Sequence, residues 1–529
     1  MVKTHWSSSA TALSLLLNTF HAPTASAIQT ISAVGSKFFY EDGTQYYIKG
    51  IAYQLIPEDP LIDTAQCTRD AARMAELGTN AIRVYHVDPK ANHDGCMKAF
   101  ADAGIYLFVD LDTFDTAISQ VCTYHHHHLY PIRDLSPDPS SYQAANKTLT
   151  HTNHFIPILQ DDPHWDQSQF DSFKAVLDAF QKYDNTAGVF VGNEVLTTKD
   201  GSAAAPYVLA AARDIKSYRN AQHYRSIPVG YSAADIAELR PMLQNYLACR
   251  SDPAERLDFF SLNAYEWCGD SSYELSGYQT LQDEAEGYPI PIFFSETGCN
   301  VARPRTFSDQ AAIFGDHMSG TWSGAMIYEW IEETNDYGLI EYGPPGADTP
   351  PTATKNIIVQ DGFTRQGEPT PIQPDFDNLK NQWATLDPTG VALSDYVKST
   401  AAISPPECPA STDGGWAVDP SAPLPTIGQA FVHADDDDNN SGGDDGATSP
   451  ASATATTTGT ASESGADSSK SVSNKQSSPS SGTNPSGVAA YSPSSGASSM
   501  HAGNGGGFLF RLDVSALFCV VIGGVAWWL

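Results

Sequence analysis

The chain has 529 residues, of which 29 are basic and 62 acidic, and its formal net charge is −33. A surface of this charge repels nucleic acid and anionic lipid headgroups, so nucleic acid is excluded as a partner. The composition is uneven along the chain, so the length overstates the number of folded domains.

Residues 1–27 are predicted to be a secretory signal peptide. Lys3 provides a weakly basic start, an apolar stretch follows at 12–17, and Ala25-Ser26-Ala27 fits the cleavage rule for small residues. A buried N-terminal helix is the alternative, but a strand pattern begins soon after Ile28.

From residue 28 to about 345, short β-branched or aromatic runs alternate with helix-like segments such as 68–77, 169–182 and 203–220. Most runs are apolar on both faces, as in a buried parallel sheet. Eight such units predict an α/β fold, a (β/α)8 TIM barrel, rather than a doubly wound sheet, because no Gly-rich phosphate loop follows the first run. The predicted strands are 46–54, 81–87, 105–111, 188–195, 227–232, 258–267, 290–298 and 324–332.

An anomalous insertion at 121–160 interrupts this pattern. It contains four consecutive histidines at 125–128 and the extra cysteine Cys122. A metal-binding loop is one interpretation, and an exposed irregular loop is preferred to it. A third interpretation is a retained intron, because Val121-Cys122 can be encoded by GTATGT and Gln160 by CAG. We favour the third as a hypothesis and predict no metal site.

Polar residues collect at the C-terminal ends of the predicted strands, where a TIM barrel builds its active site. Glu194 and Glu296 end the fourth and seventh strands, and two facing carboxyls are what glycoside cleavage needs. Either glutamate alone would be better interpreted as a structural ion pair, but both together with Asn193 favour catalysis. The full set is Gln54, Tyr85, Asp110, Asn193, Glu194, Tyr265, Glu296 and Tyr328.

The C-terminal third is predicted to carry little folded structure. Residues 346–410 form an extension packed on the barrel, and the Ser/Thr/Gly/Asp-rich segment 411–504 is a disordered stalk with a glycosylation sequon at Asn439. The apolar end at 514–529 predicts a GPI-anchor propeptide at 505–529, which is removed when the anchor is attached to Asn504. An ordinary tail anchor is the alternative.

Several motifs together resemble the fungal GPI-anchored β-1,3-glucanosyltransferases of glycoside hydrolase family 72, in the type without a Cys-rich glucan-binding module. The resemblance runs from about Ile28 to Cys408. The motifs are Lys37-Phe38-Phe39-Tyr40, Gly50-Ile51-Ala52-Tyr53-Gln54, Gly192-Asn193-Glu194-Val195, Asn263-Ala264-Tyr265-Glu266-Trp267-Cys268-Gly269, Phe294-Ser295-Glu296, Gly298-Cys299-Asn300 and Trp322-Ser323-Gly324.

The resemblance implies that Glu194 is the acid/base and Glu296 the nucleophile of a retaining enzyme, with carboxyls about 5–5.5 Å apart. It also implies the disulfides Cys67–Cys96, Cys249–Cys408 and Cys268–Cys299. The implied substrate-binding residues are Tyr85, Asn193, Asp235, Arg240, Tyr265 and Tyr328. For Tyr265 and Tyr328, packing in the core remains an alternative. Asp235 and Arg240 could instead form an ion pair with each other.

The function implied is a β-1,3-glucanosyltransferase that cleaves β-1,3-glucan internally and transfers the new reducing end to another chain. An endo-β-1,3-glucanase and a non-catalytic glucan-binding wall glycoprotein are the alternatives. The expected partners are donor and acceptor glucan chains, with no cofactor. The protein is expected to be a monomer held on the outer face of the plasma membrane by a GPI anchor, and in the cell wall.

Overall fold

The computed structural model describes residues 28–112, 116–118, 163–343, 358–399, 404–412 and 415–432. The predicted signal peptide, the insertion at 121–160 and the anchor propeptide lie outside these residues. So do Asn439, Asn504 and all of the predicted stalk after residue 432. No helix within the described ranges combines the length and the apolar character needed to cross a membrane.

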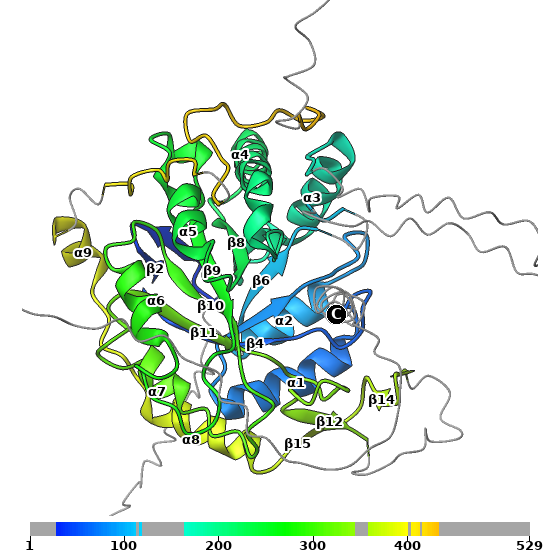
Figure 1. Ribbon diagram of the computed structural model, residues 1–529. Coiled ribbons are helices and arrows are strands. Elements are labelled where there is room, and N and C mark those ends of the chain that lie inside the picture. The colour runs from blue at the N-terminus through cyan, green and yellow to red at the C-terminus, as the bar shows by residue number, and fades with distance from the viewer. Residues whose placement is uncertain are drawn as a thin grey trace, which may run out of the picture. The chain divides into compact units, whose positions relative to one another are not determined.

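Eight parallel strands close into a barrel in chain order, which confirms the predicted (β/α)8 fold (Figure 1). The barrel closes because β4 pairs with both β5 and β11. Every predicted strand overlaps one barrel strand. The strands are β4 (Ile48–Ala52), β5 (Ala81–Val84), β6 (Tyr106–Asp110), β7 (Thr186–Asn193), β8 (Val229–Ala234), β9 (Phe259–Ala264), β10 (Ile292–Thr297) and β11 (Trp322–Ile327).

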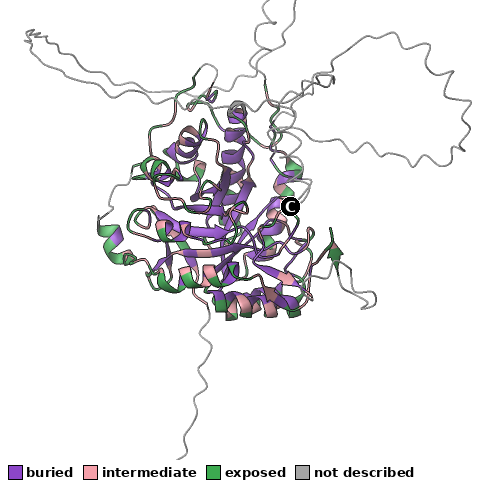
Figure 2. Cartoon of the chain, turned by 60° about the horizontal axis from the view of Figure 1, so that its bottom comes forward, coloured by how far each residue is buried: buried purple, intermediate pink, exposed green. Residues whose placement is uncertain are grey.

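One helix follows each strand, and the strands are buried while the helices expose their outer faces (Figure 2). The eighth helix, α8, contacts α1 and α7 and so completes the ring. It lies beyond residue 345, where we expected the barrel to end. The helices are α1 (Thr64–Leu77), α2 (Asp94–Asp102), α3 (Gln167–Phe180), α4 (Ala205–Ala221), α5 (Arg240–Cys249), α6 (Tyr278–Ala285), α7 (Asp309–Ile313) and α8 (Asp375–Thr385).

Local sequence explains where these helices begin and end. Asp63 caps α1 by accepting hydrogen bonds from the backbone N–H groups of Ala65 and Gln66, and Gly78 ends the helix with a φ of 91°. Asp166 and Gln169 form a reciprocal capping box at the start of α3. The loops that follow the strands are therefore held at defined positions.

A small antiparallel sheet closes the N-terminal end of the barrel. It consists of β1 (Ile31–Val34), β2 (Lys37–Tyr40) and β3 (Gln45–Tyr46). The Phe38 ring lies 5.9–6.1 Å from three rings of the barrel strands, measured between centroids: Phe108, Phe259 and Phe293. These rings fill the N-terminal end of the barrel as an aromatic plug. Only the opposite, C-terminal end of the strands is left to form an active site.

Smaller elements lie beyond the barrel strands. Two short hairpins pair β12 (Ile340–Tyr342) with β15 (Pro369–Pro371) and β13 (Val359–Gln360) with β14 (Phe363–Thr364). A last helix, α9 (Leu393–Ser399), places Tyr396 against Phe39 of the N-terminal sheet, with ring centroids 5.5 Å apart. The extension after the barrel strands is thus packed on both the ring of helices and the plug.

The described residues from 404 to 432, which we call the C-terminal strap, lie over α4 and α5 (Figure 1). Trp416 is fully buried with its ring 5.4 Å from that of Tyr246, and Arg213 donates to the Pro425 carbonyl at 2.8 Å. The folded unit therefore continues to residue 432, past the predicted start of the stalk at 411. The physical reason is the burial of Trp416 against α5, which the surrounding Pro, Ser and Asp residues make hard to recognise in the sequence.

Three disulfides are present among the described residues. They join Cys67 to Cys96, Cys249 to Cys408 and Cys268 to Cys299. These are the three pairs that the resemblance implied. The second ties the strap to the end of α5, and the third joins the loops that follow β9 and β10.

Candidate active site

Glu194 and Glu296 lie at the same end of the barrel. Glu194 directly follows the last residue of β7, and Glu296 is the penultimate residue of β10. The backbone of Glu194 adopts a left-handed conformation with φ 48°, which is costly for a residue with a side chain. Its N–H is held by the carbonyl of Ser232 at 2.8 Å, so neighbouring β8 fixes this turn.

Three donors surround the carboxylate of Glu296, whose exposed fraction is 4%. The Tyr85 hydroxyl donates to Oε1 at 2.8 Å and Arg83 Nη1 to the same oxygen at 3.2 Å. The Tyr265 hydroxyl donates to Oε2 at 2.5 Å. A carboxyl group that accepts hydrogen bonds on both oxygens in this way is fixed in place and suited to attack a bound substrate from one direction.

Glu194 has different surroundings. Its side chain is half-buried, and Oε1 accepts one hydrogen bond from Asn263 Nδ2 at 2.9 Å. Burial, together with the charge of Glu296, raises the pKa of Glu194 to about 7, while Asn263 and Arg83 oppose the rise. A carboxyl with this pKa can give and take a proton near neutral pH.

Arg83 is the hub of the site and was not predicted. Its guanidinium is fully buried between the rings of Tyr85 and Phe190, 4.4 and 4.5 Å from their centroids. It lies within hydrogen-bonding distance of side chains from five other barrel strands. They are Asp110 at 2.9 Å, Asn193 and Ser232 at 3.0 Å, Glu296 at 3.2 Å and Asn263 at 3.5 Å.

Asn263 is a second residue that sequence reasoning missed. Its Nδ2 lies 2.9 Å from Glu194 Oε1 and 3.1 Å from Asn193 Oδ1, while its Oδ1 accepts from Ser232 and Ser295 at 2.9 and 2.8 Å. Through Asn263, Asn193 and Arg83, a continuous hydrogen-bonded chain joins the two catalytic candidates.

Three tyrosines form an aromatic wall beside Glu296. Tyr265, Tyr328 and Tyr337 meet edge to face, with ring centroids 5.3–6.1 Å apart. Tyr337 was not among the predicted residues. Gln54 lies behind Tyr85 and accepts from its backbone N–H at 2.9 Å, so it positions that tyrosine.

Asp235, directly after β8, pairs with Arg240, the first residue of α5, and Arg240 also donates to Glu284 at 2.8 Å. Although it is paired, Asp235 is only half-buried, so part of its side chain remains accessible to solvent. Within the described residues, no hydrogen bond joins the pair to the network around Arg83. The structure therefore brings together all of the predicted strand-end residues and places Asp235 and Arg240 in a separate cluster.

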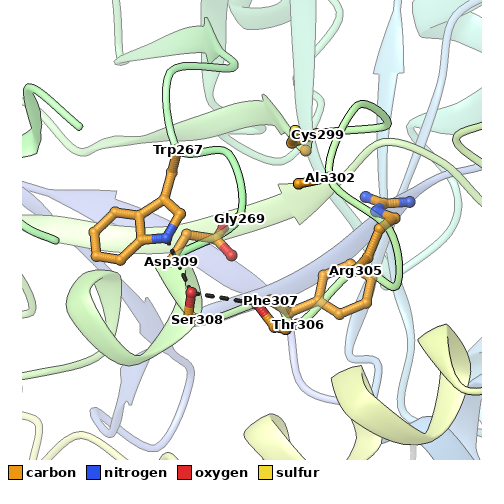
Figure 3. A pocket seen from close by; sticks show the side chains of 10 residues that line it. Trp267, Gly269, Cys299, Ala302, Arg305, Thr306, Phe307, Ser308 and Asp309 are labelled. Atoms are coloured by element: carbon orange, nitrogen blue, oxygen red, sulfur yellow. Dashed lines mark hydrogen bonds between the residues drawn. The ribbon is translucent and has the colours of Figure 1, made fainter. Parts of the chain in front are cut away.

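A hollow adjoins the site between the loops after β9 and β10 (Figure 3). Trp267, Gly298, Arg305 and Ser308 are among the residues that line it. In the part of the chain that the structure describes, no group of three His, Cys, Asp or Glu side chains is arranged to hold a metal ion. The four histidines at 125–128 lie outside that part.

Two glutamates at the ends of strands four and seven of a barrel, in unequal surroundings, define the class as a glycoside-processing enzyme. The family model of glycoside hydrolase family 72, described as glucanosyltransferase, matches residues 21–144 and 147–350. The chain belongs to this family.

Individual relatives agree with this assignment. The 1,3-beta-glucanosyltransferase gas2 of Schizosaccharomyces pombe is 36% identical over 409 residues, which cover 74% of this chain and 75% of the relative. GAS2 of Saccharomyces cerevisiae, also a 1,3-beta-glucanosyltransferase, is 36% identical, covering 74% and 62%. A solved structure of a Gas2p mutant from S. cerevisiae with laminaritetraose and laminaripentaose matches with a TM-score of 0.59 and 35% identity, covering 75% of this chain and 74% of that one.

Proposed function

We propose that this chain is a retaining β-1,3-glucanosyltransferase that cleaves β-1,3-glucan internally and transfers the new reducing end to another β-1,3-glucan chain. The observation that carries the proposal is the contrast between the two glutamates. Three donors fix the position of the Glu296 carboxyl group, whereas Glu194 accepts one hydrogen bond and has a pKa raised to about 7. Family membership and the oligosaccharides bound to the related Gas2p agree with it.

In the first step, Glu296 attacks the anomeric carbon of the donor chain and forms a glycosyl ester. The glycosidic bond breaks, and Glu194 gives its proton to the departing oxygen. Asn193 lies beside Glu194 and is proposed to bind the 2-hydroxyl of the sugar, a contact that strengthens in the transition state.

In the second step, Glu194 is a carboxylate and removes the proton from a hydroxyl of the acceptor chain. That oxygen attacks the anomeric carbon, the ester bond breaks, and Glu296 leaves as a carboxylate. Two inversions retain the configuration and restore both glutamates. The pKa of about 7 suits Glu194 to both directions of proton transfer.

We also propose which residues contact the substrate around the two glutamates. Tyr85, Tyr265 and Tyr328 border Glu296 and offer hydroxyls and aromatic faces to the sugar rings. Asp235 and Arg240, the separate pair after β8, are proposed to bind hydroxyls of the chain farther from the cut.

We also propose, from the two terminal signals, that the protein enters the secretory pathway and reaches the outer face of the plasma membrane through a GPI anchor at Asn504. It acts on glucan of the cell wall. Glycosylation at Asn439, the stalk after residue 432 and a monomeric state belong to the same proposal.

Incubation with a reduced laminari-oligosaccharide tests the function. Products longer than the substrate demonstrate transfer, and products that are only shorter would identify an endo-β-1,3-glucanase instead. The variants Glu194→Gln and Glu296→Gln are expected to lose both kinds of product. Binding of the oligosaccharide without turnover by the unmodified protein would point to a glucan-binding wall glycoprotein.

A further inference from the structure

Side chains of the loop after β10 donate hydrogen bonds to consecutive backbone carbonyls of the loop after β11. The first loop covers residues 298–308 and the second covers 328–339. The pairs of donor and carbonyl are Asn300 with Asn335 at 2.6 Å, Arg303 with Asp336, and Arg305 with Tyr337. Because each carbonyl of this run is held by a different side chain, the tip of the second loop is fixed against the first.

Arg305 holds two distant points of the loop after β11. It extends from the loop after β10 (Figure 3) and donates from Nη1 to the carbonyl of Tyr337 and from Nη2 to that of Tyr328 at 2.9 Å. One guanidinium therefore contacts the backbone of two of the three tyrosines in the aromatic wall. Its donors form a rigid planar fork, which suits it to hold two acceptors at a set separation.

Burial of this arginine is costly. Its exposed fraction is 3%, and burial lowers its pKa to about 10, although the charges of Asp375 and Asp309 oppose the change. Among the described residues, no carboxylate lies within ion-pairing distance of its guanidinium, since Asp375 pairs with Arg303 instead. Its carbon lies 4.6 Å from the centroid of the Phe307 ring. A buried cation without an anionic partner is expensive to keep, so we looked for its role in the groups that it holds.

Gly298 leaves the space that the contact between Arg305 and Tyr328 needs. A Cβ at position 298 would lie 2.9 Å from Arg305 Nη2 and 3.0 Å from the Tyr328 carbonyl oxygen, the two atoms of that hydrogen bond. It would also lie 3.3 Å from the ring of Tyr337. Gly298 comes only two residues after Glu296, so this packing lies directly behind the aromatic wall and beside the proposed nucleophile.

We propose that Arg305 is a positioning residue for substrate binding: by holding the backbone of Tyr328 and Tyr337, it keeps both rings in place where the glucan chain passes Glu296. This inference rests on the proposed function, because it takes the aromatic wall to bind sugar rings. Arg83 and Tyr85 hold Glu296 from another strand, so loss of the Arg305 contacts should weaken sugar binding more than it slows the chemical steps.

Two substitutions test this role. Arg305→Met removes both hydrogen bonds but keeps a long side chain, and Gly298→Ala crowds the same contact without removing a donor. Arg225→Met is the matched control, because Arg225 also donates to two backbone carbonyls, those of Tyr183 at 3.2 Å and Thr186 at 2.6 Å. Thr186 begins β7, so this pair of contacts lies at the opposite end of the barrel. For each protein, kcat and KM on a reduced laminari-oligosaccharide are measured with the melting temperature.

We expect Arg305→Met and Gly298→Ala to raise KM roughly tenfold, the value of about one aromatic contact, and to change kcat less than about threefold. Arg225→Met should lower the melting temperature as Arg305→Met does, yet leave KM unchanged. This contrast separates a role in binding from a role in stability alone.

Tyr337→Ala supplies a further measurement that a purely structural role would not affect. If Arg305 acts through the wall, Arg305→Met and Gly298→Ala should each raise KM less in the Tyr337→Ala protein than in the unmodified one. Should Arg305→Met fail to fold, Gly298→Ala alone and with Tyr337→Ala gives the same comparison.

An unchanged KM in the folded variants, or effects that simply add to that of Tyr337→Ala, would overturn the inference and leave the proposed function standing. If the unmodified enzyme acts on no laminari-oligosaccharide, the proposed function itself fails.

Discussion

Asn263 donates a hydrogen bond from Nδ2 to Oε1 of Glu194 at 2.9 Å. The same nitrogen has a second hydrogen and lies 3.1 Å from Asn193 Oδ1, so one amide from β9 orients two neighbouring side chains at the C-terminal end of β7. This contact also opposes the rise in the pKa of Glu194 that burial produces. Asn263 thus acts on the proposed proton donor without needing to touch the substrate.

Replacing Asn263 by Ala is expected to lower kcat roughly 10- to 100-fold, the kinetic equivalent of one hydrogen bond to a charged group. Glu194 must be protonated to start the reaction, so activity falls as the pH rises through its pKa of about 7. Loss of the Asn263 contact should raise that pKa and move this basic limb to higher pH.

The dependence of kcat/KM on pH checks this prediction. Ser261→Ala on the same strand is the control, because its hydroxyl donates to the Tyr231 carbonyl and not to either glutamate. An Asn263→Ala profile that coincides with that of the unmodified enzyme would contradict the assigned role.

Glu194→Gln should stabilise the protein at alkaline pH. The pKa of Glu194 is about 7 in the folded state, above the ordinary value of 4.5, so the folded state holds the extra proton between these values. Stability contributed by the protonated form is therefore lost as the pH rises through 7. We expect Gln to raise the free energy of unfolding by about 1–3 kcal/mol at pH 8 and to change it little at pH 4.

Denaturant unfolding at the two pH values measures this difference. The expected gain disappears as the pH is lowered, because the carboxyl is then protonated in both folded and unfolded chains. If the difference in free energy of unfolding between Glu194→Gln and the unmodified protein is the same at pH 4 and pH 8, the pKa of Glu194 is not raised by folding.

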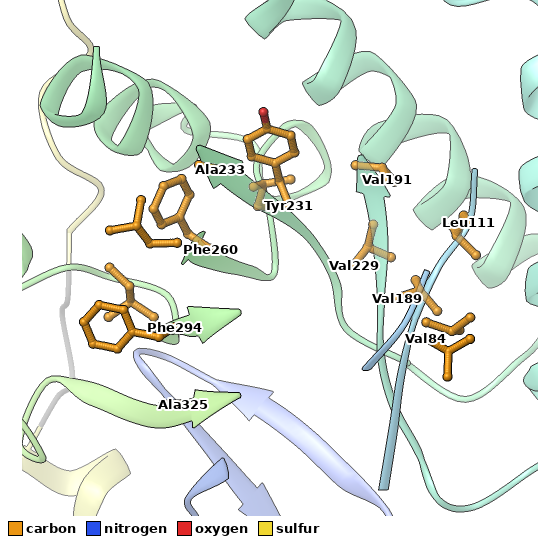
Figure 4. Packing of buried hydrophobic residues seen from close by; sticks show 14 of the residues in the cluster. Val84, Leu111, Val189, Val191, Val229, Tyr231, Ala233, Phe260, Phe294 and Ala325 are labelled. Carbon is orange, nitrogen blue, oxygen red and sulfur yellow. The ribbon is translucent and has the colours of Figure 1, made fainter. Parts of the chain in front are cut away.

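The fold could be predicted from the sequence because the barrel strands are apolar on both faces. Val189 and Val191 alternate with Phe190 on β7, and all three are buried. The valines pack outward with residues such as Val84, Val229 and Tyr231 (Figure 4), whereas Phe190 packs inside the barrel against Phe108 and Phe259. A run of this kind identifies a strand but does not say which side chains meet across the barrel.

Arg83 and Asn263 illustrate that limit. Arg83 interrupts an apolar run, Ala81-Ile82-Arg83-Val84, and a charge inside a buried strand is a signal that could have been used. Its partners, however, come from five other strands, and only closure of the barrel brings them together. Glu194 and Glu296 could be found without this information because each lies at the C-terminal end of an apolar run that is itself recognisable in the sequence.

The C-terminal strap should contribute to global stability. Trp416→Ala is expected to lower the free energy of unfolding by about 3–5 kcal/mol, because the indole is fully buried and packs on Tyr246. Val432→Ala, at a position 66% exposed, should change it by less than about 0.5 kcal/mol. Equal stability of the two variants would mean that the folded unit ends before Trp416.

The hypothesis of a retained intron at 121–160 predicts that the main transcript lacks these codons. The described residues on either side agree with a short connection, since Gln169 Nε2 donates to the Ala117 carbonyl at 3.1 Å and both Ile118 and Trp165 are buried. Sequencing the message decides the question. Reads that continue through codons 121–160 in the main message, or secretion of an active full-length form, would refute it.

The central claim is that Glu296 becomes covalently bonded to the donor sugar. A 2-deoxy-2-fluoro-laminaribiosyl fluoride should form this ester and slow its breakdown, so that peptide mass spectrometry can locate it. We predict one added glycosyl group on the peptide that contains Glu296, and none in Glu296→Gln. A label on Glu194, or continued transfer with no labelled carboxyl, would contradict the mechanism.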